Sequence, residues 1–141
     1  MFLVVDVNVI FSALIKKGKP FEVFESNKIF GTFDFITPEF LFSELDKDTD
    51  RLLSFTSLSL PELKSTLFFL KKEITIIPSS SFLDKLQEAK NLNEKDAPYL
   101  ALALKMNCPV LSGDKRLKEQ KKVSILSPAE ALEMIYSSTQ K

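Results

Sequence analysis

Residues 2–8 read FLVVDVN, an uninterrupted apolar run that ends on two polar side chains. A short valine-rich run without polar alternation is typical of a strand that is buried on both faces, as in a parallel sheet. Asp6 and Asn8 are residues that often cap helices, and residues 9–15 continue with the apolar content of a buried helix. The stretch therefore predicts a strand that turns directly into a helix.

The same alternation of strand and helix recurs along the chain. Apolar or β-branched runs predict four further strands, at residues 33–36, 74–77, 109–111 and 123–126. Helical patterns fill the intervals, at residues 21–27, 51–73, 82–89 and 97–104, and a last helix starts at 127–130. We also expect Thr37 to cap a helix, with Pro38 at its first position. This order predicts an α/β fold of three α/β/α layers around a five-stranded, mostly parallel sheet.

The amino-acid composition excludes several classes of catalytic, metal and nucleotide sites. The chain has 141 residues, no histidine and one cysteine, Cys108, which excludes Ser-His-Asp and Cys-His catalysis and any zinc site built from histidine or cysteine. Its three glycines, Gly18, Gly31 and Gly113, complete neither a Walker A loop nor a GxGxxG loop, so we expect no nucleotide cofactor. What remains is chemistry by carboxylates, hydroxyls, lysines and oxygen-ligated ions such as Mg²⁺ or Mn²⁺.

The net charge and the hydropathy of the chain limit its partners and its location less strictly than the composition limits its chemistry. Nineteen basic residues balance nineteen acidic ones, so binding of a nucleic acid would depend on a local basic patch. Residues 1–15 are largely apolar, but no basic segment precedes them, and Asp6 and Asn8 interrupt the run. The run is also too short to span a membrane. We therefore expect a cytoplasmic protein without a membrane partner.

Four acids, Asp6, Glu44, Asp96 and Asp114, lie where the chain passes from strand to helix or opens a helix. In a parallel α/β fold such positions can meet beyond the carboxyl ends of the strands. Converging carboxylates repel one another strongly unless a cation lies among them, so a divalent-metal site is the leading hypothesis. Each acid also has a simpler interpretation, because the three aspartates could be helix caps and Glu44 a solvated helix residue.

Four segments follow one another along the chain in an order and at a spacing that resemble those of a known protein family. They are VVDVNVIFSAL at 4–14, Thr37-Pro38 running into SEL at 43–45, DAPYLALA at 96–103 and VLSGD at 110–114. Together they resemble the PIN domain family, which includes VapC-type toxins and whose active members cut RNA. The resemblance covers nearly the whole chain and implies a single PIN-like domain over residues 1–141.

The resemblance implies a role for each acid. Asp6, Glu44, Asp96 and Asp114 would form an acidic pocket for Mg²⁺ or Mn²⁺, and the ion would activate a water that hydrolyses an RNA phosphodiester. We expect Asp6 and Asp114 to be direct ligands. Asp96 and Glu44 would bind through water or hold a second ion, and Asp96 is the expected proton acceptor. Asn8 and Ser112 would orient the carboxylates or a bound water.

Basic residues near the motifs are candidate contacts to RNA phosphates. They are Lys16 and Lys17 after the first helix, and Lys115, Arg116 and Lys118 after the last acid. A solvated charged face is the alternative interpretation. Many family members carry a further acid where Lys115, Arg116 and Lys118 stand here. This difference argues against a second ion, and the number of ions stays open.

The resulting hypothesis is a divalent-metal-dependent ribonuclease, with the toxin of a toxin–antitoxin pair as one option. The resemblance makes a homodimer and an antitoxin protein the expected partners besides RNA. A few of the phenylalanines, such as Phe55 and Phe69, could line a dimer face, which the sequence does not assign. Two alternatives remain. One is a PIN-like binding module that has lost catalysis. The other, a haloacid-dehalogenase-type phosphatase, lacks the second acid of its Asp-x-Asp pair, because Asn8 stands there.

Overall fold

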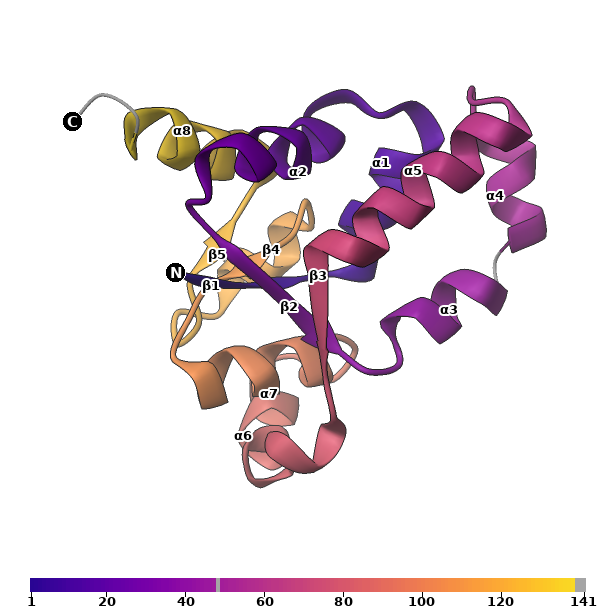
Figure 1. Cartoon of the computed structure of the whole chain (residues 1–141). Coiled ribbons are helices and arrows are strands. Elements are labelled where there is room, and N and C mark those ends of the chain that lie inside the picture. The colour runs from indigo at the N-terminus through magenta and orange to yellow at the C-terminus, as the bar shows by residue number, and fades with distance from the viewer. Residues whose placement is uncertain (48, 139–141) are drawn as a thin grey trace.

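A five-stranded sheet forms the centre of the computed structural model, which describes residues 1–47 and 49–138 (Figure 1). The strands are β1 (Phe2–Val5), β2 (Asp34–Pro38), β3 (Ile74–Ile77), β4 (Val110–Leu111) and β5 (Ile125–Leu126). They lie in the order β3-β2-β1-β4-β5, and all four neighbouring pairs are parallel. The predicted five-stranded parallel sheet is confirmed.

Helices cover both faces of this sheet. The α-helices are α1 (Val7–Lys16), α2 (Gly18–Phe30), α3 (Leu41–Lys47), α4 (Thr49–Phe55), α5 (Leu60–Glu73), α6 (Leu86–Leu92), α7 (Ala97–Met106) and α8 (Pro128–Ser138). Short 3₁₀ turns are η1 (Ser79–Ser81), η2 (Leu83–Lys85) and η3 (Lys115–Glu119). In Figure 1, α6 and α7 lie on one face, and α1, α2, α5 and α8 lie on the other. Among the described residues, no helix combines the length and the apolar character that crossing a membrane requires.

The strand β1 lies at the centre of the sheet, and three of its four residues are buried. Leu3, Val4 and Val5 are fully buried, as expected for a strand between two neighbours and two helical layers. Val4 pairs with Ile36 of β2 on one side and with Val110 of β4 on the other. The apolar run at residues 2–5 thus forms the strand that its composition predicts.

The direction of the chain reverses beside β1. From β1 the sheet grows through β2 to β3, and the chain then returns through α6 and α7 to place β4 on the other side of β1. Such a reversal opens a crevice at the carboxyl ends of the two central strands, where parallel α/β proteins bind their ligands. Asp6 follows β1 at this point, and its backbone N–H donates to the carbonyl oxygen of Leu111 at 3.1 Å.

The predicted helix start at Thr37 and Pro38 is wrong. Both residues belong to β2, in register with Ile76 and Ile77, and α3 begins only at Leu41. Thr37 is fully buried, and its hydroxyl donates to the carbonyl oxygen of Val5 at 3.0 Å. The side chain that would have capped a helix therefore joins two strands instead. The basic segment after Asp114 forms only the 3₁₀ turn η3.

Candidate active site

Asp6 is the centre of the site and is almost completely buried, with 1% of its surface exposed. One oxygen, Oδ1, accepts from the backbone N–H of Asn8 at 3.3 Å and caps α1. The other, Oδ2, accepts from the hydroxyl of Ser112 at 2.8 Å. Burial, with a smaller contribution from the charges of Asp96 and Asp114, raises the pKa of Asp6 to about 6, against the lowering effect of these hydrogen bonds.

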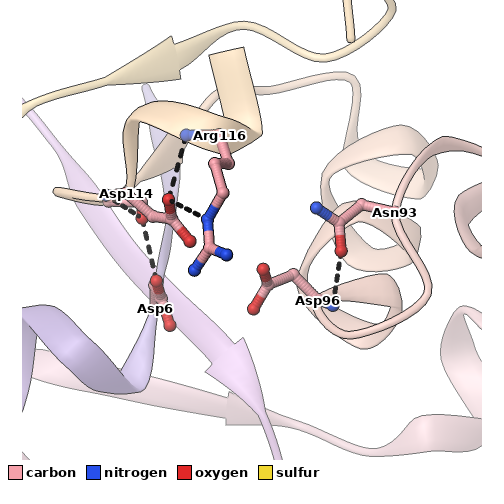
Figure 2. A network of polar contacts seen from close by, with 6 residues as sticks. Asp6, Asn93, Asp96, Asp114 and Arg116 are labelled. Atoms are coloured by element: carbon pink, nitrogen blue, oxygen red, sulfur yellow. Dashed lines mark hydrogen bonds and ion pairs between the residues drawn. The ribbon is translucent and has the colours of Figure 1, made fainter. Parts of the chain in front are cut away.

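Ser112 joins the ends of β1 and β4. Its buried hydroxyl donates to Asp6 and also accepts from the backbone N–H of Asp114 at 3.1 Å. Asp114 is partly exposed, and its Oδ1 accepts from the backbone N–H of Arg116 at 2.9 Å, which caps η3. The two hydrogen bonds of Ser112 place the carboxyl groups of Asp6 and Asp114 on the same side of the sheet edge (Figure 2).

Asp96 occupies the cap position of α7 but does not cap it. Its carboxylate makes no capping hydrogen bond, while its backbone N–H donates to Oδ1 of Asn93 at 3.1 Å. Only 6% of the residue is exposed. Burial raises the pKa of Asp96, and Asp114 adds to this, whereas Lys95 and Arg116 oppose it. Figure 2 shows the Asp96 carboxylate turned toward the loop that carries Asp114 and Arg116.

Glu44 reaches the site through a tyrosine. Its Oε2 accepts from the hydroxyl of Tyr99 at 3.4 Å. Tyr99 is buried in α7, and burial, followed by the charges of Glu44 and Asp6, raises its pKa. The hydroxyl therefore stays protonated and lies among the acids as a hydrogen-bond donor. Sequence reasoning missed Tyr99, although it is the only residue with a polar side chain in the run of small and apolar residues at 97–104.

The predicted phosphate contacts divide into two groups. Arg116 is near the acids, because its Nε lies 3.5 Å from Oδ1 of Asp114 and its guanidinium extends toward Asp96 (Figure 2). Lys115 is exposed on the same turn, whereas Lys118 forms an ion pair with Glu130.

Lys16 and Lys17 lie at the opposite end of α1 from Asp6. A helix of this length separates its ends by about 15 Å. The Nζ of Lys17 lies over the ring of Phe21, 4.9 Å from its centroid. The structure therefore does not bring these two lysines to the acids.

The placement of the acids does not by itself form a metal site, whereas the chemistry of their side chains suits a metal ion. Among the side chains that the structure describes, no three from cysteine, aspartate or glutamate are close enough together to hold one ion. The chemistry of the donors nevertheless fits a hard divalent cation, since all of them are oxygens and Asp6 is a buried carboxylate. None of the ion pairs in the described part of the chain involves Asp6. Binding of an ion would thus need one carboxylate to shift or to act through water.

Two hollows flank these acids, and Asn8 lines both. One, of about 380 Å³, lies between α1, α3 and α4 and includes Glu44 in its wall. The other, of about 340 Å³, borders Asp114 and Arg116. Asn8 is exposed, and its side chain stands between the hollows while its backbone holds Asp6. A ligand could therefore extend from the acids to either side.

Comparison with known protein families shows which family the chain matches. A family model described as PIN domain matches residues 4–130. The matched segment begins within β1 and includes all four acids of the site. No curated protein matches the chain.

Proposed function

The chain belongs to the PIN domain family, whose members are generally metal-dependent nucleases that act on RNA, and from this premise we propose that it is a Mg²⁺- or Mn²⁺-dependent ribonuclease. The observation that carries the proposal is Asp6, a buried carboxylate with Asp96 and Asp114 near it. A buried cluster of acids destabilises a protein unless a cation or a substrate compensates for it.

The acids have different expected roles. Asp6 and Asp114 would hold the ion directly, while Asp96 and Glu44 would bind it through water. When bound, the ion would neutralise charge on the scissile phosphate and make a water more acidic. Ser112 orients Asp6 through the hydrogen bond to its Oδ2, and Tyr99 restrains Glu44 in the same way.

Asp96 is the residue that would accept the proton of the attacking water. A raised pKa makes a carboxylate a better base near neutral pH, and the Asp96 carboxylate is not engaged in capping its helix. Hydrolysis would leave a 5′-phosphate and a 3′-hydroxyl. A toxin role beside an antitoxin protein, a homodimeric state and a cytoplasmic location remain predictions from the family resemblance.

One observation favours a second candidate, a PIN-like binding module without catalysis. Arg116 lies against Asp114 in the stretch where many family members carry another acid. Its guanidinium supplies positive charge that a metal ion would otherwise supply. The two candidates differ in whether RNA is cut or only bound.

Cleavage of single-stranded RNA in the presence of Mn²⁺ or EDTA separates them. We expect cleavage with Mn²⁺ only, and a loss of at least about 100-fold in Asp6→Asn. Asp34→Asn is the matched control, because Asp34 is an exposed aspartate at the amino end of β2, on the opposite edge of the sheet. Equal activity in Asp6→Asn and Asp34→Asn would contradict the proposal. Binding without cleavage by the wild-type protein would favour the binding module.

A further inference from the structure

The larger hollow beside the acids shares Asn8 and Glu44 with the candidate active site. We refer to it as the α1–α4 cleft; its lining includes Asn8, Phe11, Glu44, Lys47, Arg51 and Phe55. Glu44 accepts a hydrogen bond from Tyr99, and the backbone N–H of Asn8 donates to Asp6. An occupant of the α1–α4 cleft therefore contacts Asn8 and Glu44 near the acids, while Phe55 bounds the cleft near the other end of α1, where Thr56 donates to the carbonyl oxygens of Leu14 and Ile15.

The lining combines aromatic rings with positive charge. Phe55 ends α4 and leaves 63% of its surface exposed, although most large apolar side chains of this protein are buried in the core. Phe11 is half-buried on α1. Lys47 and Arg51 line the same cleft, and none of the ion pairs among the side chains that the structure describes involves either of them. Aromatic faces beside positive charges are the combination that binds a base and its phosphate.

The hollow on the other side of Asn8 has a different character. Ser12, Lys95 and Arg116 line it together with Asp114, and none of the described residues in its lining is aromatic. Such a surface can hold phosphates through Lys95 and Arg116 but offers no ring for stacking. The two sides of the acids therefore differ in what they can recognise.

We propose that the α1–α4 cleft is a nucleotide subsite that takes one unpaired base of single-stranded RNA where the strand leaves the acids and runs along α1. The inference rests on the proposed ribonuclease function and specifies its substrate. The base stacks on Phe55 and Phe11, and Arg51 and Lys47 contact the adjoining phosphate. On the other side of Asn8 the strand is held by its phosphates alone.

The charge of the cleft decides between possible occupants. An apolar peptide or a second copy of this chain could cover Phe55, but neither accounts for two cations on the same wall. An anionic strand with bases that stack satisfies both features. A duplex does not fit, because its bases are already stacked and paired, and an unpaired base can enter the cleft at lower cost.

Binding of short RNAs with single missing bases tests the proposal. The probes are a fluorescein-labelled single-stranded RNA pentamer and five versions of it, each with one abasic nucleotide. Fluorescence anisotropy is measured with Ca²⁺ in place of Mn²⁺, and gels verify that the RNA stays intact. We expect one abasic position to weaken binding to the wild-type protein about tenfold, the usual effect of a lost stack.

Substitutions of Phe55 assign that loss to the cleft. Phe55→Ala should weaken binding of the intact pentamer about tenfold and leave the affinity for the sensitive abasic pentamer unchanged. Phe55→Trp should restore tight binding, because it keeps a stacking face. Phe68→Ala is the matched control, since Phe68 is equally exposed, on α5, and lies outside the cleft. It should bind every probe as the wild-type protein does.

Several outcomes would overturn the subsite. These are equal affinity for all six probes, equal behaviour of Phe55→Ala and Phe68→Ala, or a change of oligomeric state in Phe55→Ala without loss of RNA affinity, which would make the cleft an interface between copies. A parallel cleavage assay with Mn²⁺ separates the two claims. If the wild-type protein cuts RNA while the subsite test fails, the ribonuclease function stands alone; if it neither binds nor cuts RNA, both are contradicted.

Discussion

Acids at the carboxyl edge of the sheet differ from acids at the surface helix starts. Burial raises the pKa of Asp6 to about 6 and also raises that of Asp96. At the start of α5, hydrogen bonds from Ser59 lower the pKa of Glu62. At the start of α8, Glu130 accepts from Lys118 and from Ser127, which lowers its pKa to about 2. The surface acids thus favour the folded state when charged, whereas the acids at the sheet edge oppose it.

The difference indicates which acids serve a purpose other than folding. Glu62 and Glu130 complete capping boxes with Ser59 and Ser127, so their negative charge satisfies nearby donors. A charged Asp6 is buried beside two further aspartates, and this arrangement is unfavourable without a bound cation. Perturbation of this sign in a group of buried acids is typical of functional sites.

The largest expected effect is on catalysis by Asp96. Asp96→Asn should slow Mn²⁺-dependent RNA cleavage about 100-fold, because an amide cannot accept a proton. The melting temperature should not fall, since the carboxylate does not cap α7. Glu62→Gln is the control from the surface group and should leave the cleavage rate unchanged. Similar rates in the two variants would remove the functional distinction between the groups.

The next effect concerns stability without metal. In EDTA at pH 7.5, Asp6→Asn should raise the free energy of unfolding by about 2 kcal/mol, since it removes a buried charge and keeps the shape of the side chain. Chemical denaturation of both proteins measures this difference. A less stable Asp6→Asn variant under these conditions would contradict the assigned burial cost.

The pH dependence of that difference follows from the pKa of Asp6. Its folded value, about 6, lies above its ordinary value of 3.8, so the folded protein binds the proton more tightly. The stability from this group is fully present below pH 3.8 and is lost as pH rises through about 6. The gap between Asp6→Asn and the wild-type protein should therefore be nearly closed at pH 4.

The fold and the site could be predicted from the sequence where a local pattern and the tertiary contacts favour the same structure. The apolar run before Asp6 and the Ser127–Glu130 cap both act within a few residues, and both are present as predicted. The proximity of Asp6 and the loop of Asp114 follows from parallel strands that end at one edge.

Sequence reasoning failed where a contact distant in the chain decides the outcome. Thr37 has the local pattern of a cap, but its hydroxyl bonds to Val5 of the neighbouring strand. The hydroxyl of Tyr99 has its partner, Glu44, 55 positions away. Lys17 is near Asp6 in sequence, yet the length of α1 separates them. None of these results can be read from spacing alone.

A smaller effect is expected at the surface caps. Ser59→Ala should lower the free energy of unfolding by about 1 kcal/mol, because the hydroxyl accepts from the backbone N–H of Glu62 at the start of α5. Ser80→Ala, a change of an exposed serine in η1, is the control and should have no measurable effect. RNA cleavage should be unaffected in both. A loss of activity in Ser59→Ala would mean that the two groups of acids are coupled.

The smallest effect is expected at Arg116. Arg116→Met should tighten Mn²⁺ binding about threefold, because it removes an exposed cation that competes for Asp114, and exposed pairs are weak. Lys115→Met is the matched control, because it removes a positive charge from the same 3₁₀ turn and keeps the contact between Arg116 and Asp114. Isothermal titration with Mn²⁺ should leave Lys115→Met close to the wild-type protein. Weaker binding in Arg116→Met would instead make Arg116 part of the support of the site.

Anomalous scattering from crystals grown with Mn²⁺ tests the central claim most directly. The account predicts one strong manganese peak between the carboxyl groups of Asp6 and Asp114, and its absence in crystals of Asp6→Asn. A wild-type crystal with no manganese at this edge of the sheet, or with manganese bound only elsewhere, would contradict the account.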